Sequence, residues 1–402
     1  MTKDKIRILF VGDLVVPTGF STVLHNIIKP NTEDFDIVGL GVNYKGDPHN
    51  LGIPVYPAVG DIYGVRRLIE IINQERIDII FILNDAWVIS YYLEALKGAF
   101  KDGNMPKIVA YFPVDSMYHN STWYRDFDIV NRAFTYTEFG KSVVNQCIPE
   151  MNVEIMPHGT DTETFYQRHP DSYTSKVEYL GEKTLEMFGK KEDLFFVLNA
   201  NRNQPRKRLD ITMEGFSIFA KGKPMGVRLY MHTGAVDSSV DIGYISQRYG
   251  IDNRLILTNL TRGIQRVPLD RLNLIYNACD IGINTGMGEG WGLTSTEHAV
   301  TGAVQIVPNH SACVELFGDC GIVMPTVTNY TFDNSQTVGK LVSPLEVALS
   351  LETLYSDKKL REELSEKGMK KFTGKEYRWS YIANQWKTVF EEVANDNSPV
   401  PE

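Results

Sequence analysis

Two carboxylates beside a glycine-rich loop are the residues of this sequence whose types and spacing best suit chemistry. Glu289 lies in the loop and Glu297 follows eight residues later, within residues 280–308. An apolar strand precedes the loop and a short helix follows it, so the unpaired N–H groups of that helix would point beside the loop. Because such a helix end attracts anions, above all phosphate, the sequence predicts an anion site with two carboxylates around it.

The two carboxylates differ in their structural alternatives. Thr294 and Glu297 have the spacing of a capping box, which would start the helix near Thr294 and give Glu297 a structural role. Gly302 is expected to end that helix. Glu289 lies among four glycines and has no such role, so we expect it to contact a ligand. An acid/base pair is a further interpretation, but residues at this spacing need not converge.

Four cations follow a predicted strand in the run RNQPRKR, residues 202–208. A solvated loop is the common interpretation of such a run, and a nucleic-acid patch is a second. In open α/β sheets, however, ligands bind beyond the carboxyl ends of the strands, where these cations would meet a pyrophosphate. The position favours this third interpretation.

Other candidate groups have structural explanations. Two Asp-Phe-Asp motifs, at residues 34–36 and 126–128, resemble the DxD element with which some sugar-nucleotide enzymes hold a metal. Neither follows a glycine loop, so we interpret both as coincidental and predict no catalytic metal. His158 and His298 lie nearest the motifs. His298 adjoins Glu297, but consecutive helix residues point about 100° apart, so structural roles are expected for both histidines.

Strands and helices alternate in two series, which predicts an α/β fold with mostly parallel sheets. The first series opens with a strand, a glycine turn and a helix from Ser21, without the dinucleotide fingerprint GxGxxG. Its predicted strands are residues 6–11, 37–40, 77–83, 107–112 and 133–136. Those of the second series are residues 194–200, 228–232, 255–258, 280–284 and 305–307.

The composition is that of a globular protein with two or three domains, since the chain has 402 residues and is 43% hydrophobic. A net charge of −9 argues against bulk attraction to nucleic acid or anionic lipid. The four cysteines lack CxxC spacing, which favours free thiols in a reducing compartment. No apolar run approaches the ~18 residues of a membrane span, so we expect a cytoplasmic protein without a transmembrane segment.

In order and spacing, these motifs resemble the retaining nucleotide-sugar glycosyltransferases of family 4, also called group-one glycosyltransferases. Glu289-Gly-Trp-Gly-Leu with Glu297 is similar to the family's EGFG...E element. Arg202 and Lys207 are similar to the arginine and lysine of its GRL...KG element, although Asn201 replaces the glycine before the arginine. Weaker similarities lie at residues 157–165, 276–280 and 314–315.

The resemblance implies an α/β fold of the GT-B type, with two Rossmann-like doubly wound domains facing across a cleft. We place the N-terminal acceptor domain at residues 1–160 and the C-terminal nucleotide-sugar donor domain at residues 161–375. Residues 376–394 are expected to form a helix that packs back on the N-terminal domain, and residues 395–402 a disordered tail.

The resemblance also implies roles for the matched residues. Arg202 and Lys207 would neutralise the donor pyrophosphate and the departing diphosphate without a metal. Glu297 would accept hydrogen bonds from the donor ribose, and Glu289 would hold hydroxyls of the transferred sugar as a catalytic residue. The remaining donor-binding residues would be Gly19, Gly290, Trp291, Gly292 and Leu293, the last three through backbone N–H groups.

The sequence departs from the family in two further places. Where the family often has a His-Asp pair, this chain has Phe112-Pro-Val-Asp115, so Asp115 would keep the catalytic position while Val114 replaces the histidine. The loop 285–288 reads TGMG where a serine is common, which would alter the fit of the sugar.

These features predict a metal-independent retaining glycosyltransferase, a hexosyl- or pentosyltransferase, with a nucleoside-diphosphate sugar as co-substrate and no cofactor. Its partner would be a hydroxyl acceptor: a glycan, a lipid-linked sugar, a small molecule or a modified DNA base. Action on a modified DNA base and a non-catalytic nucleotide-sugar binding module stay open as alternatives, and the absent GxGxxG weakens a nicotinamide dehydrogenase. Base recognition is expected near residues 258–263; the donor base, the sugar and the oligomeric state stay open.

Overall fold

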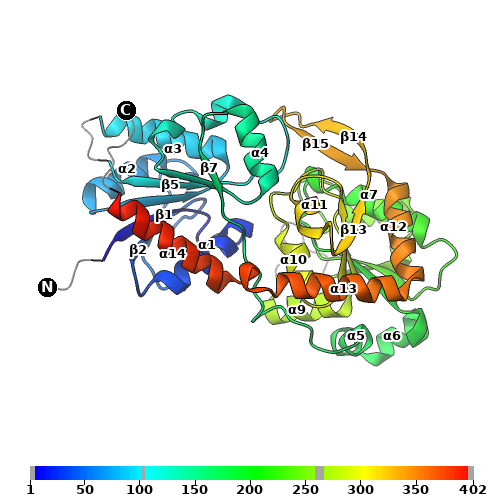
Figure 1. Ribbon diagram of the computed structural model, residues 1–402. Helices are drawn as coiled ribbons and strands as arrows, with labels where there is room; N and C mark the ends of the chain where they lie inside the picture. The colour runs from blue at the N-terminus through cyan, green and yellow to red at the C-terminus, as the bar shows by residue number, and fades with distance from the viewer. Residues whose placement is uncertain (1–4, 102–104, 259–266, 397–402) are drawn as a thin grey trace. The chain divides into compact units, whose positions relative to one another are not determined.

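The computed structural model describes residues 5–101, 105–258 and 267–396, which form two compact units (Figure 1). Unit 1 comprises the described residues up to Val114, residues 118–159 and the C-terminal helix from Trp379. Unit 2 comprises residues 115–117 and 160–378. Each unit is built on a parallel sheet with helices, which confirms the predicted α/β class with two Rossmann-like domains.

The sheet of unit 1 has the strand order β3-β2-β1-β4-β5-β6-β7, and all its strands are parallel. Its order reverses between β1 and β4, which is the topological switch point of a doubly wound sheet. Five of the strands coincide with predicted runs; the three-residue strands β3 and β7 carry too little pattern to be found. The bounds are β1 (Arg7–Gly12), β2 (Asp36–Gly41), β3 (Val55–Pro57), β4 (Ile79–Leu83), β5 (Lys107–Tyr111), β6 (Arg132–Thr135) and β7 (Val153–Ile155).

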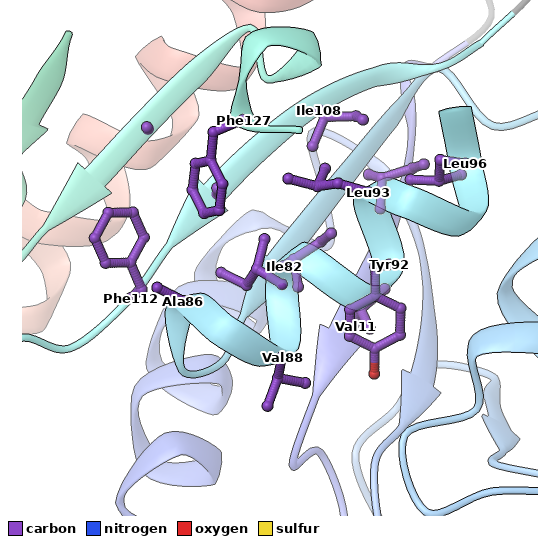
Figure 2. Close-up of a cluster of buried hydrophobic side chains, with 14 of the residues drawn as sticks. Val11, Ile82, Ala86, Val88, Tyr92, Leu93, Leu96, Ile108, Phe112 and Phe127 are labelled. Carbon is purple, nitrogen blue, oxygen red and sulfur yellow. The ribbon is translucent and has the colours of Figure 1, made fainter. Parts of the chain in front are cut away.

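One face of this sheet is covered by α2 (Val65–Gln74), α3 (Ala86–Ala99) and α4 (Glu138–Cys147). Figure 2 shows Leu93 of α3 among apolar side chains of the sheet that include Ile82 and Ile108. All three are fully buried. Because burying such a side chain stabilises a fold by roughly 1.5–3 kcal/mol, this core holds α3 and the loop before it in place.

Helix α1 (Gly19–Asn31) follows β1 and begins earlier than predicted. Thr18, rather than Ser21, is the N-cap residue: its side chain accepts from the backbone N–H of Ser21, and the Ser21 hydroxyl lies 2.9 Å from the Thr18 backbone nitrogen. The predicted start at Ser21 is therefore two residues too late, and Ser21 is instead the second member of the capping box.

Helix α14 (Trp379–Asn395) belongs to unit 1 and packs along α1 (Figure 1). Asn31 donates from Nδ2 to the carbonyl oxygen of Ala383 at 3.2 Å. Trp386 is fully buried, with its ring centroid 4.9 Å from that of Phe81. The last helix of the chain therefore completes the core of the first unit.

The main sheet of unit 2 has the order β10-β9-β8-β11-β12-β13, again parallel, and it reverses between β8 and β11. A separate antiparallel hairpin, β14 with β15, was not predicted. The bounds are β8 (Phe195–Asn199), β9 (Val227–Met231), β10 (Leu255–Leu257), β11 (Ile281–Ile283), β12 (Val304–Pro308), β13 (Gly321–Met324), β14 (Thr326–Thr331) and β15 (Val338–Val342).

The helices of unit 2 surround a core in which Phe216, Leu229 and Val347 are fully buried. Residues 344–372 form two helices that are separated at Asp357. The Asp357 side chain accepts from the backbone N–H of Leu360 at 2.9 Å and caps the second helix. The bounds are α5 (Ser172–Leu180), α6 (Glu182–Phe188), α7 (Leu209–Phe219), α8 (Ile242–Arg248), α9 (Leu269–Ala278), α10 (Leu293–Ala299), α11 (Ala312–Phe317), α12 (Pro344–Ser356) and α13 (Lys358–Phe372).

None of the helices in the described ranges is long and apolar enough to cross a membrane. Two predicted features lie largely outside the described residues. Of the predicted base-recognition segment, residues 258–263, only Thr258 is described. Of the predicted tail, residues 397–402 are outside the described ranges.

Candidate functional site

The candidate site lies at the switch point of the unit 2 sheet. Strands β8 and β11 are parallel neighbours, so their carboxyl ends meet at one edge of the sheet. The loop after β8 carries Arg202, Arg206 and Lys207, and the loop after β11 carries Glu289. The fold thus brings together two motifs about eighty positions apart in the sequence.

Lys207 and Glu289 form an ion pair between these two loops. The Lys207 Nζ donates to Oε2 of Glu289, and the side chains are only 8% and 12% exposed. Burial lowers the pKa of Lys207, and the negative charge of Glu289 opposes that shift. Burial by itself would raise the pKa of Glu289, but the charges of Lys207 and Arg206 outweigh it, so the pKa of this carboxyl falls below its ordinary value. Glu289 is therefore held as a carboxylate.

Two further side chains fix Glu289, and no sequence pattern marks either of them. Asn284, directly after β11, donates from Nδ2 to Oε2 of Glu289 at 3.3 Å. The backbone N–H of Glu289 donates to the hydroxyl of Ser311 at 3.0 Å. An asparagine after a strand and a serine before a helix are too common in sequences to signal such roles.

Arg206 holds the glycine loop. The sequence alone gives it no role distinct from those of the other cations in residues 202–208. Its Nη1 donates to the carbonyl oxygen of Gly288 at 3.0 Å and lies 3.4 Å from Oδ2 of Asp115. The backbone N–H of Met287 donates to the carbonyl oxygen of Arg206 at 2.8 Å. A Cβ atom at Gly288 would collide with the carbonyl oxygen of Asp115, so this position requires glycine. Asp115 therefore lies beside the loop, in contact with Arg206.

Arg202 occupies the outer part of the same loop. Its side chain is 45% exposed, and its Nε donates to Oδ2 of Asp237 at 3.1 Å. Arg202 and Lys207 thus share a loop but not an environment, since one reaches solvent and the other is buried. The contact of Arg202 with a pyrophosphate stays a prediction.

The predicted capping box at Thr294 is wrong. Helix α10 has Gly292 as its N-cap residue, at φ 97°, and begins at Leu293. Glycine adopts this left-handed conformation without steric cost, so the loop turns into the helix two residues before Thr294. Thr294 and Glu297 therefore lie inside the helix, where neither can form the box.

Glu297 has another partner instead. The hydroxyl of Tyr276, on α9, donates to Oε2 of Glu297 at 3.3 Å. Burial raises the pKa of Glu297 to about 8, against the smaller opposing effect of this hydrogen bond. Contact between Glu297 and a ribose stays a prediction.

The remaining predicted donor residues lie in two places. Gly290 and Trp291 are buried in the loop before α10, where the Trp291 ring centroid is 6.2 Å from that of Tyr377. Leu293 is the first residue of α10. Gly19 lies in unit 1 as the first residue of α1. Their contacts with a donor stay predictions.

The two Asp-Phe-Asp motifs pair with cations. Lys97 Nζ lies 3.0 Å from Oδ1 of Asp126 and 2.9 Å from Oδ2 of Asp128. Asp34 and Asp36 pair with Lys387 and Arg7 respectively. Within residues 5–101, 105–258 and 267–396, no group of three or more His, Cys, Asp and Glu side chains could hold a metal ion.

The two histidines near the motifs are buried and hydrogen-bonded. His158 Nδ1 lies 2.8 Å from the hydroxyl of Tyr111, and burial lowers its pKa to about 3. His298 Nε2 lies 3.1 Å from the carbonyl oxygen of Tyr276, and burial lowers its pKa to about 4. Both are neutral at ordinary pH and stabilise the interiors of their units.

Comparison with known proteins shows what this fold is. No family model matches the chain, and no curated protein sequence matches it. Solved structures match over nearly its whole length, and they include nucleotide-sugar glycosyltransferases of the GT-B fold. The chain therefore has the GT-B fold, as its motifs predicted.

Three of these structures illustrate the likeness. HepE from Anabaena, solved with UDP and glucose, is 14% identical with a TM-score of 0.71, and the match covers 96% of this chain and 100% of HepE. Sucrose-phosphate synthase from Thermosynechococcus elongatus is 11% identical with a TM-score of 0.71, covering 97% and 99%. A glycosyltransferase from Rickettsia africae is 14% identical with a TM-score of 0.66, covering 98% and 100%.

Proposed function

We propose that this protein is a retaining, metal-independent glycosyltransferase that moves a sugar from a nucleoside-diphosphate sugar to a hydroxyl acceptor. The observation that carries the proposal is the buried Lys207–Glu289 pair at the unit 2 switch point. Open α/β sheets bind ligands at such a point, and HepE, which has the same fold, was solved with UDP and glucose.

The cations of the loop after β8 suit a diphosphate. Lys207 supplies a buried positive charge and Arg202 an exposed one that can form bidentate hydrogen bonds with phosphate oxygens. As the bond from the anomeric carbon to the phosphate oxygen breaks, negative charge develops on the departing diphosphate. Fixed cations stabilise that charge without reorganisation, so the proposed reaction needs no metal ion for this purpose.

Glu289 suits the transferred sugar. Its Oε2 is occupied by Lys207 and Asn284, whereas Oε1 accepts no hydrogen bond from the described residues. A carboxylate oxygen with free acceptor capacity binds a sugar hydroxyl. The ion pair keeps this carboxylate charged and fixes its direction, so it can orient the sugar ring while the diphosphate departs.

Retention needs no protein nucleophile in this proposal. The acceptor oxygen bonds to the anomeric carbon on the face that the diphosphate leaves, and the acceptor proton passes to a departing phosphate oxygen. Asp115 was predicted as a catalytic residue; its contact with Arg206, and through Arg206 with Gly288, supports a role in positioning the loop.

A donor panel tests the proposal. UDP-, GDP- and ADP-sugars are added to the full chain and the melting temperature is measured, because a ligand that binds only the native state raises it. We expect one class of donor to raise it and to be turned over. Glu289→Gln should then lower turnover about 10²–10³-fold, the usual effect of removing one group that stabilises a transition state.

Glu366→Gln, an exposed carboxylate on α13, is the matched control and should leave turnover unchanged. No shift with any donor, or equal turnover by the Glu289→Gln variant, contradicts the proposal. A shift without product from any acceptor would instead favour the non-catalytic binding module.

A further inference from the structure

Unit 1 has a switch point of its own, between β1 and β4. Val11 pairs with Ile82 across these parallel strands, so the residues that follow them leave the same edge of the sheet. Asp13 follows β1, and Asn84 and Asp85 follow β4. The rule that places a ligand at the switch point of unit 2 applies here equally.

Asp13 is a buried carboxylate held by neutral groups. It is 9% exposed and accepts hydrogen bonds from the Thr18 hydroxyl at 3.0 Å and from Nδ2 of Asn43 at 3.4 Å. Burial raises its pKa, and the two hydrogen bonds oppose that shift. Within the described part of the chain, Asp13 has no ion-pair partner, in contrast to Glu289.

Asn84 is buried with part of its hydrogen-bonding capacity unused. It is 6% exposed, and its Oδ1 accepts from the backbone N–H of Asp85 at 2.9 Å. Its Nδ2 donates to no group among the described residues. The Nδ2 atom keeps contact with solvent although the residue as a whole is buried, so it is open to a ligand that brings a hydrogen-bond acceptor.

An aromatic group adjoins these polar side chains. The rings of Tyr63 and Tyr91 each lie edge to face with that of Trp87, at centroid distances of 6.0 and 5.7 Å. Tyr91 is 49% exposed, so its ring is accessible to a ligand. The backbone N–H of Asn43 donates to the carbonyl oxygen of Ile62 at 2.8 Å, and Nδ2 of the same asparagine donates to Asp13, so the segment that carries Tyr63 lies beside Asp13.

We propose that this unit 1 edge cluster, defined as Asp13, Asn84, Asp85, Tyr63 and Trp87, binds an uncharged sugar ring of the acceptor. Carboxylates accept hydrogen bonds from sugar hydroxyls, and the Asn84 amide donates to a ring or hydroxyl oxygen. The aromatic rings cover the apolar C–H face of the sugar. Sites with a few placed polar groups on an aromatic surface are typical for small ligands.

The same charges select against anionic acceptors. Asp13 brings negative charge to the site, because within the described chain its hydrogen-bond partners are neutral groups and no cation pairs with it. A phosphate about 4 Å from a carboxylate is repelled by ~1 kcal/mol in water and ~4 kcal/mol near a protein surface. The cluster therefore disfavours sugar phosphates and the DNA backbone. This inference rests on the proposed function, because it names the acceptor of that reaction.

The experiment measures binding by saturation-transfer NMR on the full chain. The probes are the methyl glycosides of glucose, galactose and mannose, with glucose 6-phosphate and a DNA duplex as anionic competitors. We expect at least one neutral glycoside to bind and the anionic probes not to displace it. Trp87→Leu and Asn84→Ala should each weaken that binding about tenfold.

Two variants keep the test independent of folding. Tyr91→Ala removes an exposed ring that packs against Trp87 of the cluster, so it should weaken glycoside binding several-fold. Tyr244→Ala, at a 65% exposed tyrosine on α8 of unit 2, should not. Preferential binding of glucose 6-phosphate or DNA would overturn the inference, as would glycoside binding that none of the unit 1 variants changes.

A donor measurement separates this inference from the proposed function. If UDP-sugars raise the melting temperature and no glycoside binds, the unit 1 inference fails while the proposed function stands. If glycosides bind in a manner that Trp87→Leu abolishes but no nucleotide sugar binds, the sugar site stands and the donor assignment fails.

Discussion

The two switch points differ in charge although the two sheets have the same topology around them. In unit 2 the loops after β8 and β11 carry a lysine and a glutamate that neutralise one another, with two arginines beside them. In unit 1 the loops after β1 and β4 carry Asp13 and Asp85, and neutral donors hold Asp13. Topology therefore sets where a ligand can bind, and the side chains after the strands set the charge of that ligand.

The largest expected effect comes from breaking the unit 2 pair with Lys207→Ala. Removing one partner of a buried ion pair costs about 3–5 kcal/mol, because the other charge is left buried and unpaired. We expect a melting temperature lower by many degrees and loss of donor turnover. In unit 1, Asp13→Asn leaves no charge unpaired and should cost far less.

A double variant, Lys207→Met with Glu289→Leu, sharpens this contrast. Apolar replacement of both partners is often neutral for stability, so the melting temperature should recover while turnover stays lost. Urea unfolding of Lys207→Ala, of Asp13→Asn and of the double variant measures the free energy of unfolding of each protein. Equal losses in the single and double variants would contradict a coupled pair.

Gly288→Ala is the next largest change. A Cβ atom there would meet the backbone oxygen of Asp115, which cannot give way as a flexible side chain could. Overpacking of this kind costs roughly 1–3 kcal/mol, and it should displace the loop that carries Glu289. The matched control is Gly98→Ala in α3 of unit 1, where a Cβ meets nothing within 4 Å. That change should stabilise by about 0.5–1 kcal/mol, so equal effects on the melting temperature would contradict the steric argument.

The pH dependence of stability compares a buried carboxyl in each unit. The pKa of Glu297 is raised to about 8 in the folded protein, above the ~4.3 of an unfolded glutamate. Its contribution is therefore fully present below about pH 4 and is lost as the pH rises through 8, when folding must bury the charged form. Glu297→Gln should remove this loss, on the order of 2 kcal/mol since the residue is partly accessible, between pH 6 and pH 9.

Asp13 in unit 1 has the same direction of shift, because burial raises its pKa. Asp13→Asn should flatten the stability profile too, in the window just above the ~3.9 of an unfolded aspartate. Melting temperatures measured from pH 4 to pH 9 test both. A Glu297→Gln profile parallel to that of the unchanged protein would mean that Glu297 is already charged when folded.

The sequence predicted the fold well because parallel strands are buried on both faces and stand out as apolar runs. Residues 79–83, predicted within 77–83, are all fully buried. The missed strands β3, β7 and β13 have three or four residues and lie at or near sheet edges, where the apolar pattern is weakest. The hairpin of β14 and β15 is polar and largely exposed along β14, so no apolar alternation marks it.

The candidate site was only partly predictable. The motifs predicted its location, but they could not predict which residues far apart in the sequence pair with one another. Lys207 and Glu289, for example, are 82 positions apart. Helix starts depend on local backbone geometry, which is why Gly292 at positive φ displaced the expected cap at Thr294. The unit 1 edge cluster could not be predicted from the sequence, because its residues form no motif and gather only through strand register.

The smallest expected effect concerns the exposed cation of unit 2. Arg202 is 45% exposed and pairs with Asp237, and exposed pairs contribute about 0–1 kcal/mol, so Arg202→Ala should leave the melting temperature nearly unchanged. If Arg202 binds the donor diphosphate, the same variant should still raise the donor KM several-fold. Added salt should reduce the difference between the two proteins, because it screens an exposed charge. The buried Lys207 is screened far less, so turnover by the unchanged protein should keep most of its value in salt. If Arg202→Ala leaves the donor KM unchanged, Arg202 does not contact the diphosphate, and the diphosphate binds only at the buried part of the loop.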